Sequence, residues 1–117
     1  MDRFDAERLW RFRAAPIRVI DGDTIVVLID TGFHGRHEAT IRLADFDAPE
    51  LNTPEGKKAK DKMFSVVGWM SSSGWPLRIV TRQAKTKVSE VMSFTRYVAD
   101  VYIFDVDNVM VNIKDLL

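Results

Sequence analysis

Cysteine is absent from the 117-residue sequence. The chain can therefore form no disulfide framework and no thiolate metal site, so any bound metal ion must use carboxylates, histidines or carbonyl oxygens. The sequence also lacks an excess of either charge, because 17 Lys and Arg residues balance 17 Asp and Glu residues. The overall field gives no long-range attraction toward a polyanion, and any nucleic-acid binding must come from local clusters of charge.

Long apolar runs are absent as well. No run approaches membrane-spanning length, and the opening residues 1–5 carry no basic stretch followed by an apolar segment. We therefore expect a cytoplasmic protein without a membrane segment. The sequence has no internal repeat, low-complexity tract or linker, and at this length a second core would leave each half too small. Residues 1–117 are expected to form a single domain.

The hydrophobic pattern predicts three strands, one helix and two further strands. Runs rich in β-branched and aromatic residues, bounded by turn residues, mark the strands: Trp10–Ile20, Thr24–Ile29, Glu38–Ala44, Leu77–Thr81 and Tyr97–Phe104. Between the third and fourth strands, apolar residues recur at helical spacing: Ala59, Met63, Val66, Val67 and Met70. Asn112 is placed to cap a short final helix, Ile113–Leu117.

This order of elements predicts an α+β fold that is mainly β. Three meandering strands, a helix and two more strands fit a five-stranded Greek-key barrel of the OB type. The main helix would plug one end of the barrel, and the short C-terminal helix would follow the last strand.

Acidic and basic residues concentrate in two otherwise apolar segments, 19–24 and 41–50. A hard divalent cation needs several oxygen ligands, and carboxylates at strand ends can converge on one when Gly and Pro turns hold them. Asp23 and Asp47 are the proposed ligands. Hydrolysis of a phosphodiester also needs a group that takes a proton from water and cations that meet the charge developing on phosphorus. Glu50 and Arg42 supply these two types of group.

The same segments resemble the signature of the staphylococcal nuclease (thermonuclease)-like domain family. The family pattern reads Asp-Gly-Asp-Thr, then Arg, then an Asp-x-Pro-Glu turn, which here correspond to residues 21–24, Arg42 and residues 47–50. A later family arginine precedes the Leu-Ala or Val-Ala of the fifth strand and matches Arg96. Around it, Phe and Thr replace the Tyr and Gly of the family's Tyr-Gly-Arg segment. The resemblance covers about residues 15–115.

The resemblance implies a calcium-dependent nuclease that hydrolyses phosphodiester bonds of DNA or RNA. It implies that Ca²⁺ is the cofactor and that Asp23, Asp47 and the carbonyl oxygen of Ala48 bind it. The products would carry 3′-phosphate and 5′-hydroxyl ends. The expected partner is therefore a nucleic-acid substrate, and we expect a monomer, with a homodimer as the alternative.

The resemblance also implies the roles of the remaining site residues. Glu50 would be the general base or would position the attacking water, and Arg42 and Arg96 would bind the phosphate and stabilise the transition state. Guanidinium groups suit this task because they make bidentate contacts to phosphate oxygens. Tyr97 and Tyr102 share a strand with Arg96 and are the candidate contacts to the bases.

Each motif has a structural interpretation when it is taken alone. Asp-Gly-Asp is commonly a hairpin turn, and Arg42 or Glu50 can be ordinary surface residues. For Asp21 and Asp45 a structural role, or a role in orienting the ligands, is favoured over direct metal binding. Only the joint spacing favours catalysis over the alternative function, a catalytically inactive OB-fold module that binds single-stranded nucleic acid.

Histidine and tryptophan residues allow two interpretations each. His34 and His37 are expected in a solvated hairpin tip rather than in a zinc site, because no further ligand accompanies them. The three tryptophans could stack on bases, although packing in the core is favoured: Trp10, Trp69 and Trp75.

Overall fold

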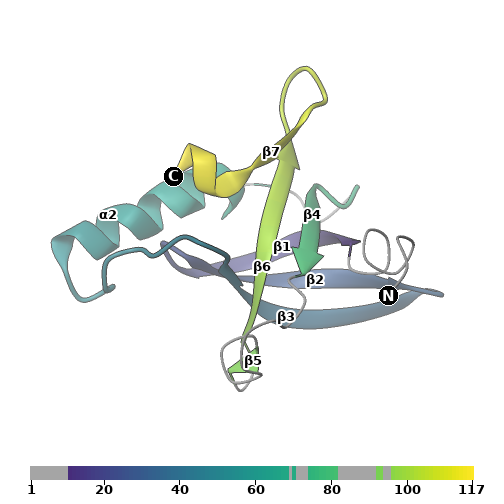
Figure 1. Cartoon of the computed structure of the whole chain (residues 1–117), viewed down its shortest axis with the longest axis horizontal. Helices are drawn as coiled ribbons and strands as arrows, with labels where there is room; N and C mark the ends of the chain where they lie inside the picture. The colour runs from purple at the N-terminus through teal and green to yellow at the C-terminus, as the bar shows by residue number, and fades with distance from the viewer. Residues whose placement is uncertain (1–10, 69, 71–73, 82–91, 94–95) are drawn as a thin grey trace.

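Five strands of the computed structural model close into a barrel (Figure 1). The structure describes residues 11–68, 70, 74–81, 92–93 and 96–117. The barrel strands are β1 (Arg11–Asp21), β2 (Thr24–Gly32), β3 (Gly35–Leu43), β4 (Leu77–Thr81) and β6 (Arg96–Phe104). The first three form an antiparallel meander, β4 pairs with β1, and β6 pairs with β4. A parallel pairing of β6 with β3 closes the ring.

Shorter elements complete the fold. They are the helix α2 (Pro54–Met63), the π-helical turn η1 (Phe64–Gly68), the strands β5 (Met92–Ser93) and β7 (Met110–Asn112), and the 3₁₀ turn η2 (Ile113–Leu116). Among the described residues, no helix is long and apolar enough to span a membrane.

The predicted α+β, mainly β barrel with one main helix and a short C-terminal helix is confirmed. Asn112 caps the C-terminal turn as expected, since its side-chain oxygen accepts a hydrogen bond from the Lys114 N–H at 3.1 Å. The main helix is shorter than its apolar pattern suggested: regular α-helix ends at Met63, and Val66 and Val67 lie in the π-helical turn. Trp10 and Trp69 lie outside the described residues.

The barrel interior is filled by aliphatic side chains that alternate along the strands. Buried residues come from every barrel strand: Ala14, Ile25, Val27, Ile41, Leu43, Leu77, Ile79, Ala99 and Val101. Met63 and Val67 from α2 and η1, and Ile113 from η2, complete this core. Full burial of one such side chain stabilises the fold by about 1.5–3 kcal/mol, so the core holds the strands in register.

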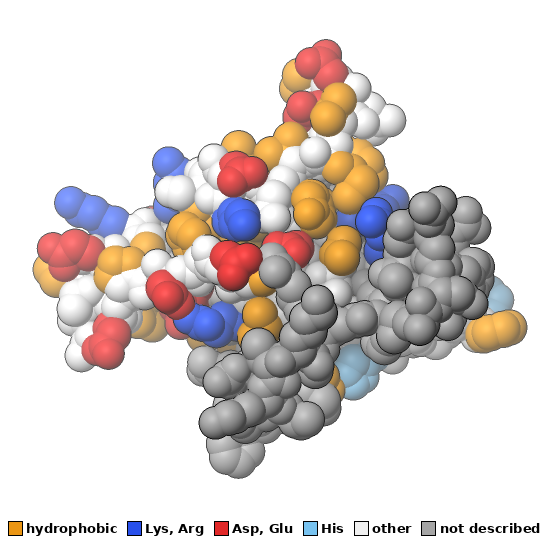
Figure 2. Space-filling view, viewed as in Figure 1, with side chains coloured by type: hydrophobic (Ala, Val, Ile, Leu, Met, Phe, Trp, Pro, Cys, Tyr) orange, Lys and Arg blue, Asp and Glu red, His pale blue; other side chains and the backbone are white. Residues whose placement is uncertain are grey.

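Beyond the barrel, β6 and β7 form a projecting hairpin, seen at the top of Figure 1. The carboxylate of Asp105 fixes its turn by accepting hydrogen bonds from the N–H groups of Asp107 and Val109, both at 2.9 Å. Acidic and apolar side chains share the hairpin tip (Figure 2), where Val106 is fully exposed.

Candidate functional site

Two loops bring the charged segments together at one end of the barrel. Asp21 ends β1 and Asp23 lies in the turn between β1 and β2, while the loop that follows β3 carries Asp47 and Ala48. The strands fix this arrangement, because Thr24 pairs with Arg42 and the Leu43 N–H donates to the Asp23 carbonyl at 2.9 Å. The two charged segments of the sequence therefore lie side by side.

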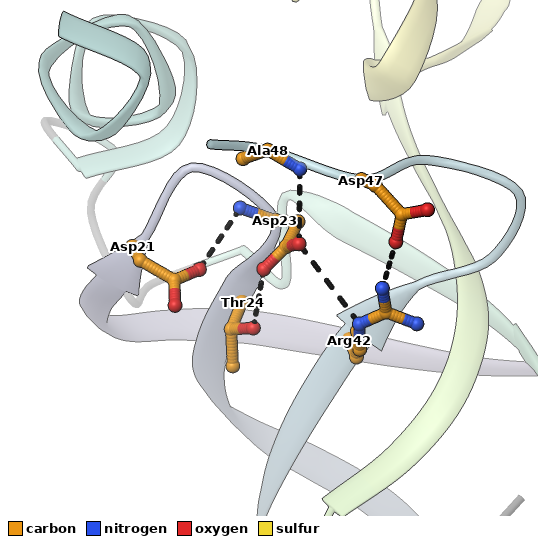
Figure 3. A network of polar contacts seen from close by, with 6 residues as sticks. All are labelled: Asp21, Asp23, Thr24, Arg42, Asp47 and Ala48. Carbon is orange, nitrogen blue, oxygen red and sulfur yellow. Dashed lines mark hydrogen bonds and ion pairs between the residues drawn. The ribbon is translucent and has the colours of Figure 1, made fainter. Parts of the chain in front are cut away.

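Asp23 is the buried centre of the site (Figure 3). Its side chain is only 13% exposed. One carboxylate oxygen accepts a hydrogen bond from the Thr24 hydroxyl at 2.8 Å, and the other accepts one from the Ala48 N–H at 3.1 Å. A buried carboxylate is tolerated when such donors satisfy it. These bonds also hold the Ala48 segment against the β1–β2 turn.

Arg42 lies between the two candidate ligands. Its Nε is 3.9 Å from an Asp23 oxygen, and its Nη2 donates a hydrogen bond to Asp47. The Asp47 side chain is 82% exposed, so its carboxylate reaches this point from the solvent side. Two carboxylates from distant segments thus converge on one positive charge.

Asp21 and Asp23 are neighbouring carboxyl groups, and the Asp23 N–H donates a hydrogen bond to an Asp21 carboxylate oxygen at 3.0 Å. Burial raises the pKa of Asp21, and its side-chain hydrogen bond with Asp23 raises it further. Burial also acts to raise the pKa of Asp23, but it is outweighed by hydrogen bonds from Asp21, Ala48 and Thr24 and by the charge of Arg42, which lower this pKa. The surroundings thus shift the two carboxyl groups in opposite directions, the pKa of Asp21 upward and the pKa of Asp23 downward.

Glu50 lies in the loop before α2, with its side chain exposed and its backbone held by Thr53. Its carbonyl oxygen accepts hydrogen bonds from the Thr53 N–H at 3.0 Å and the Thr53 hydroxyl at 2.6 Å. Thr53 also caps α2, accepting from the Gly56 N–H at 3.0 Å. Within the described part of the chain, the Glu50 carboxylate itself makes no hydrogen bond or ion pair. The Glu50 carboxylate is therefore accessible from the solvent.

Two glycines let α2 pack closely against the site. A Cβ on Gly22 would lie 2.6 Å from the Ala59 Cβ and 2.7 Å from the Ala48 Cβ, and a Cβ on Gly56 would lie 1.8 Å from the Glu50 carbonyl oxygen. Sequence reasoning assigned no such role to either glycine. A glycine inside a helical segment was the available signal, because it normally weakens a helix and needs a packing reason.

The remaining predicted residues lie on β6. Arg96 begins the strand and pairs with Thr40 of β3, two residues before Arg42; the structure describes its backbone only. Tyr97 packs against the core, with its ring 6.5 Å from that of His37. Tyr102 is five residues further on and therefore faces the opposite side of the strand. The two tyrosines do not share a surface.

The donor set at this site suits a hard cation. Two carboxylates, of Asp23 and Asp47, lie beside Ala48, whose carbonyl is the third expected ligand. Oxygen donors of this kind are the ones that Ca²⁺ uses. Among the described residues, no three His, Asp or Glu side chains are already grouped as a metal site. Any cation would therefore depend on the mixed set of side-chain and backbone oxygens.

Part of the chain is similar to known proteins. A 52-residue segment is 40% identical to micrococcal nuclease of Shigella flexneri, covering 44% of this chain and 27% of that protein. A 55-residue segment is 38% identical to Protein ParB of Escherichia coli, covering 47% of this chain and 28% of that protein. The chain thus spans little more than a quarter of these relatives, and no protein-family model matches it. The barrel and this partial match fit a nuclease-like domain.

Proposed function

We propose that this protein is a calcium-dependent nuclease of the staphylococcal nuclease type, which hydrolyses phosphodiester bonds of DNA or RNA. The observation that carries the proposal is the convergence of Asp23 and Asp47 on the Arg42 guanidinium beside Ala48. The partial identity to micrococcal nuclease supports the same reaction class.

Asp23, Asp47 and the Ala48 carbonyl would hold the Ca²⁺ ion. When bound, Ca²⁺ supplies a Lewis acid that polarises the phosphate and neutralises part of its charge. Calcium is preferred over magnesium because Asp47 is largely exposed and the protein offers few oxygens, an arrangement that suits a flexible coordination shell. Asp23 fits its role because its lowered pKa keeps it ionised.

The side chains of this chain would carry the reaction itself. Glu50 takes a proton from the attacking water, a role for which its carboxylate is suited because it is exposed and has no partner among the described residues. The water oxygen forms a bond to phosphorus while the bond to the 5′ oxygen breaks. The leaving 5′ oxygen takes a proton from solvent, which gives a 3′-phosphate and a 5′-hydroxyl. Arg42 exchanges its carboxylate partners for phosphate oxygens, and Arg96 contributes a second guanidinium. Each arginine would lower the barrier by roughly 3–6 kcal/mol.

The test is cleavage of labelled single-stranded DNA, duplex DNA and RNA by the wild type, Glu50→Gln and Arg96→Gln. Glu50→Gln keeps the shape of the side chain and removes only the base, so its rate should fall on the order of 10²–10⁴-fold. Lys57→Gln, on the exposed face of α2, is the control for a lost charge and should cleave like the wild type. Circular dichroism checks that each variant is folded.

The same experiment separates the nuclease from an inactive binding module. A folded wild type that binds single-stranded DNA but cuts no substrate with Ca²⁺, Mg²⁺ or Mn²⁺ would favour the binding module. Equal cleavage by wild type and Glu50→Gln would remove Glu50 from the mechanism.

A further inference from the structure

A row of arginines crosses the outer wall of the barrel at the end away from Asp23. Tyr102 on β6 pairs with Arg78 on β4, which pairs with Arg13 on β1. Arg13 forms an ion pair with Asp30 on β2 at 2.5 Å, and Asp30 pairs with Arg36 on β3. One row therefore runs over all five barrel strands. On β1, β2, β4 and β6, residues next to the row in sequence are buried, which directs the row outward on these strands: Ala14, Ile29, Leu77, Ile79 and Val101. On β3, Arg36 itself is exposed.

Aromatic rings are interleaved with these arginines. Two guanidinium groups lie over the Trp75 ring, that of Arg13 at 5.3 Å and that of Arg36 at 5.6 Å from the ring centroid. The Arg78 guanidinium lies 4.9 Å from the Phe104 ring, which is partly exposed. We call the three arginines with Trp75 and Phe104 the arginine stripe. It contains the two kinds of side chain that hold single-stranded nucleic acid, namely cations for phosphates and flat rings for bases.

Two features of this arrangement carry a local energetic cost. Arg13 and Arg78 are direct cross-strand neighbours, and like charges in that position are destabilising. Trp75 adopts a left-handed backbone conformation, with φ of 51°, which L-residues rarely adopt. Arg78 donates to the Trp75 carbonyl at 2.7 Å and to the Leu77 carbonyl at 2.9 Å, so it fixes the Trp75 backbone. Arg13 and Arg36 are the exposed arginines of the stripe, and the ion pair with Asp30 uses the Nε of Arg13.

The stripe is distinct from the candidate cleavage site. Arg36 and Arg42 lie at opposite ends of β3, and the rise over six residue steps of extended strand separates their Cα atoms by about 20 Å. Because the whole chain has a formal net charge of zero, the stripe supplies a local attraction that the overall field lacks. Figure 2 shows acidic and basic side chains mixed over the rest of the described face.

We propose that the arginine stripe binds the part of a single-stranded nucleic acid that lies outside the cleavage site. Arg13 and Arg36 would contact phosphates, and Trp75 and Phe104 would stack on bases. The inference rests on the proposed function for the identity of the ligand, but binding by the stripe requires neither calcium nor cleavage. An acidic peptide would use the arginines and leave the aromatic rings without a matching partner.

The test measures binding of a labelled 20-nucleotide DNA strand in EDTA by fluorescence anisotropy over a range of salt concentrations. Arg13→Gln/Arg36→Gln should weaken binding about tenfold and reduce the slope of log K against log salt by about 1.4, since each single-strand phosphate contact contributes about 0.7. Lys57→Gln/Lys58→Gln removes the same charge from α2 and should keep the wild-type slope. Arg36→Gln alone leaves the Arg13–Asp30 ion pair intact. This single variant should reduce the slope of log K against log salt by about half as much as the double variant does.

The outcomes distinguish the stripe from the nuclease. Equal affinity and slope in the wild type and the stripe variants, or no binding by the wild type, would overturn the stripe as a binding site. Stripe-dependent binding without calcium-dependent cleavage would leave the stripe standing and remove the nuclease. A dinucleotide is too short to span the distance of about 20 Å between the cleavage site and the stripe. If both the nuclease and the stripe proposals hold, Arg13→Gln/Arg36→Gln should cleave a dinucleotide with calcium at the wild-type rate.

Discussion

Arg42 is the residue at which the two candidate ligands meet, so its removal separates catalysis from stability. Arg42→Gln should lower the cleavage rate at least about 10²-fold, because a charge that stabilises the transition state is lost. The free energy of unfolding should change by only about 1 kcal/mol or less, because the guanidinium is 39% exposed and solvent screens its ion pairs. Arg42→Lys keeps the charge but not the two-pronged geometry, so it should recover little activity. Wild-type rates in both variants would contradict the assignment.

Asp30 offers a test of pH dependence away from the candidate site. Hydrogen bonds from the Gly32 N–H and from Arg13 lower the pKa of Asp30 below its ordinary value of 3.8. A lowered pKa in the folded state gives stability that is present above the ordinary value and is lost as pH falls through the folded value. Asp30→Asn should therefore be less stable than the wild type at pH 7, and the difference should disappear in acid. Urea unfolding at pH 7 and near pH 2.5 measures the free energy of unfolding of the two proteins. If Asp30→Asn is still less stable than the wild type in acid, the loss of stability has a cause other than the charge of Asp30.

At the scale of elements, α2 holds the site in place through close approaches to the two loops. Gly56→Ala in a helix would ordinarily stabilise the protein by about 1 kcal/mol. Here the added Cβ would lie 1.8 Å from the Glu50 carbonyl, so the sign should reverse. We expect a loss of about 1–3 kcal/mol together with slower cleavage, because Glu50 is displaced.

The matched control for this prediction is Lys58→Ala, an exposed position on the same helix. It should retain the wild-type rate and stability, as measured by urea unfolding and by cleavage of the labelled strand. A Gly56→Ala variant that is more stable than the wild type would show that the approach between α2 and the Glu50 loop is not tight.

The elements differ in how well the sequence predicts them. β4 matches its predicted bounds because Leu77–Thr81 combines buried aliphatic residues with a turn before it. β7 was not predicted, since its three residues become a strand only by pairing with the end of β6. The close packing of Gly22 on Ala59 depends on residues far apart in the chain, which local periodicity cannot reveal.

The signature residues could be found in the sequence because turns hold Asp23 and Asp47 at strand ends. The arginine stripe could not be found, because its residues become neighbours only through the register of the strands.

At the scale of the whole molecule, the proposed calcium site links metal binding to stability. A ligand that binds only the folded state stabilises it by about 2.7 kcal/mol when its concentration is 100 times the dissociation constant. Calcium should therefore raise the thermal midpoint of the wild type, and Asp47→Asn should lose this response. Asp45→Asn, an exposed acid in the same loop, should keep it. An identical calcium response in all three proteins would place the ion elsewhere.

The most direct test of the proposed function is the initial rate of cleavage of end-labelled single-stranded DNA at rising Ca²⁺ concentration, with an EDTA blank, by the wild type and Asp23→Asn. We predict cleavage by the wild type that saturates with Ca²⁺ and is absent in EDTA. In Asp23→Asn, which keeps the shape of the buried side chain but loses its charge, the rate should fall at least about 10²-fold. Cleavage that continues in EDTA, or that proceeds at the wild-type rate in Asp23→Asn, would contradict the account.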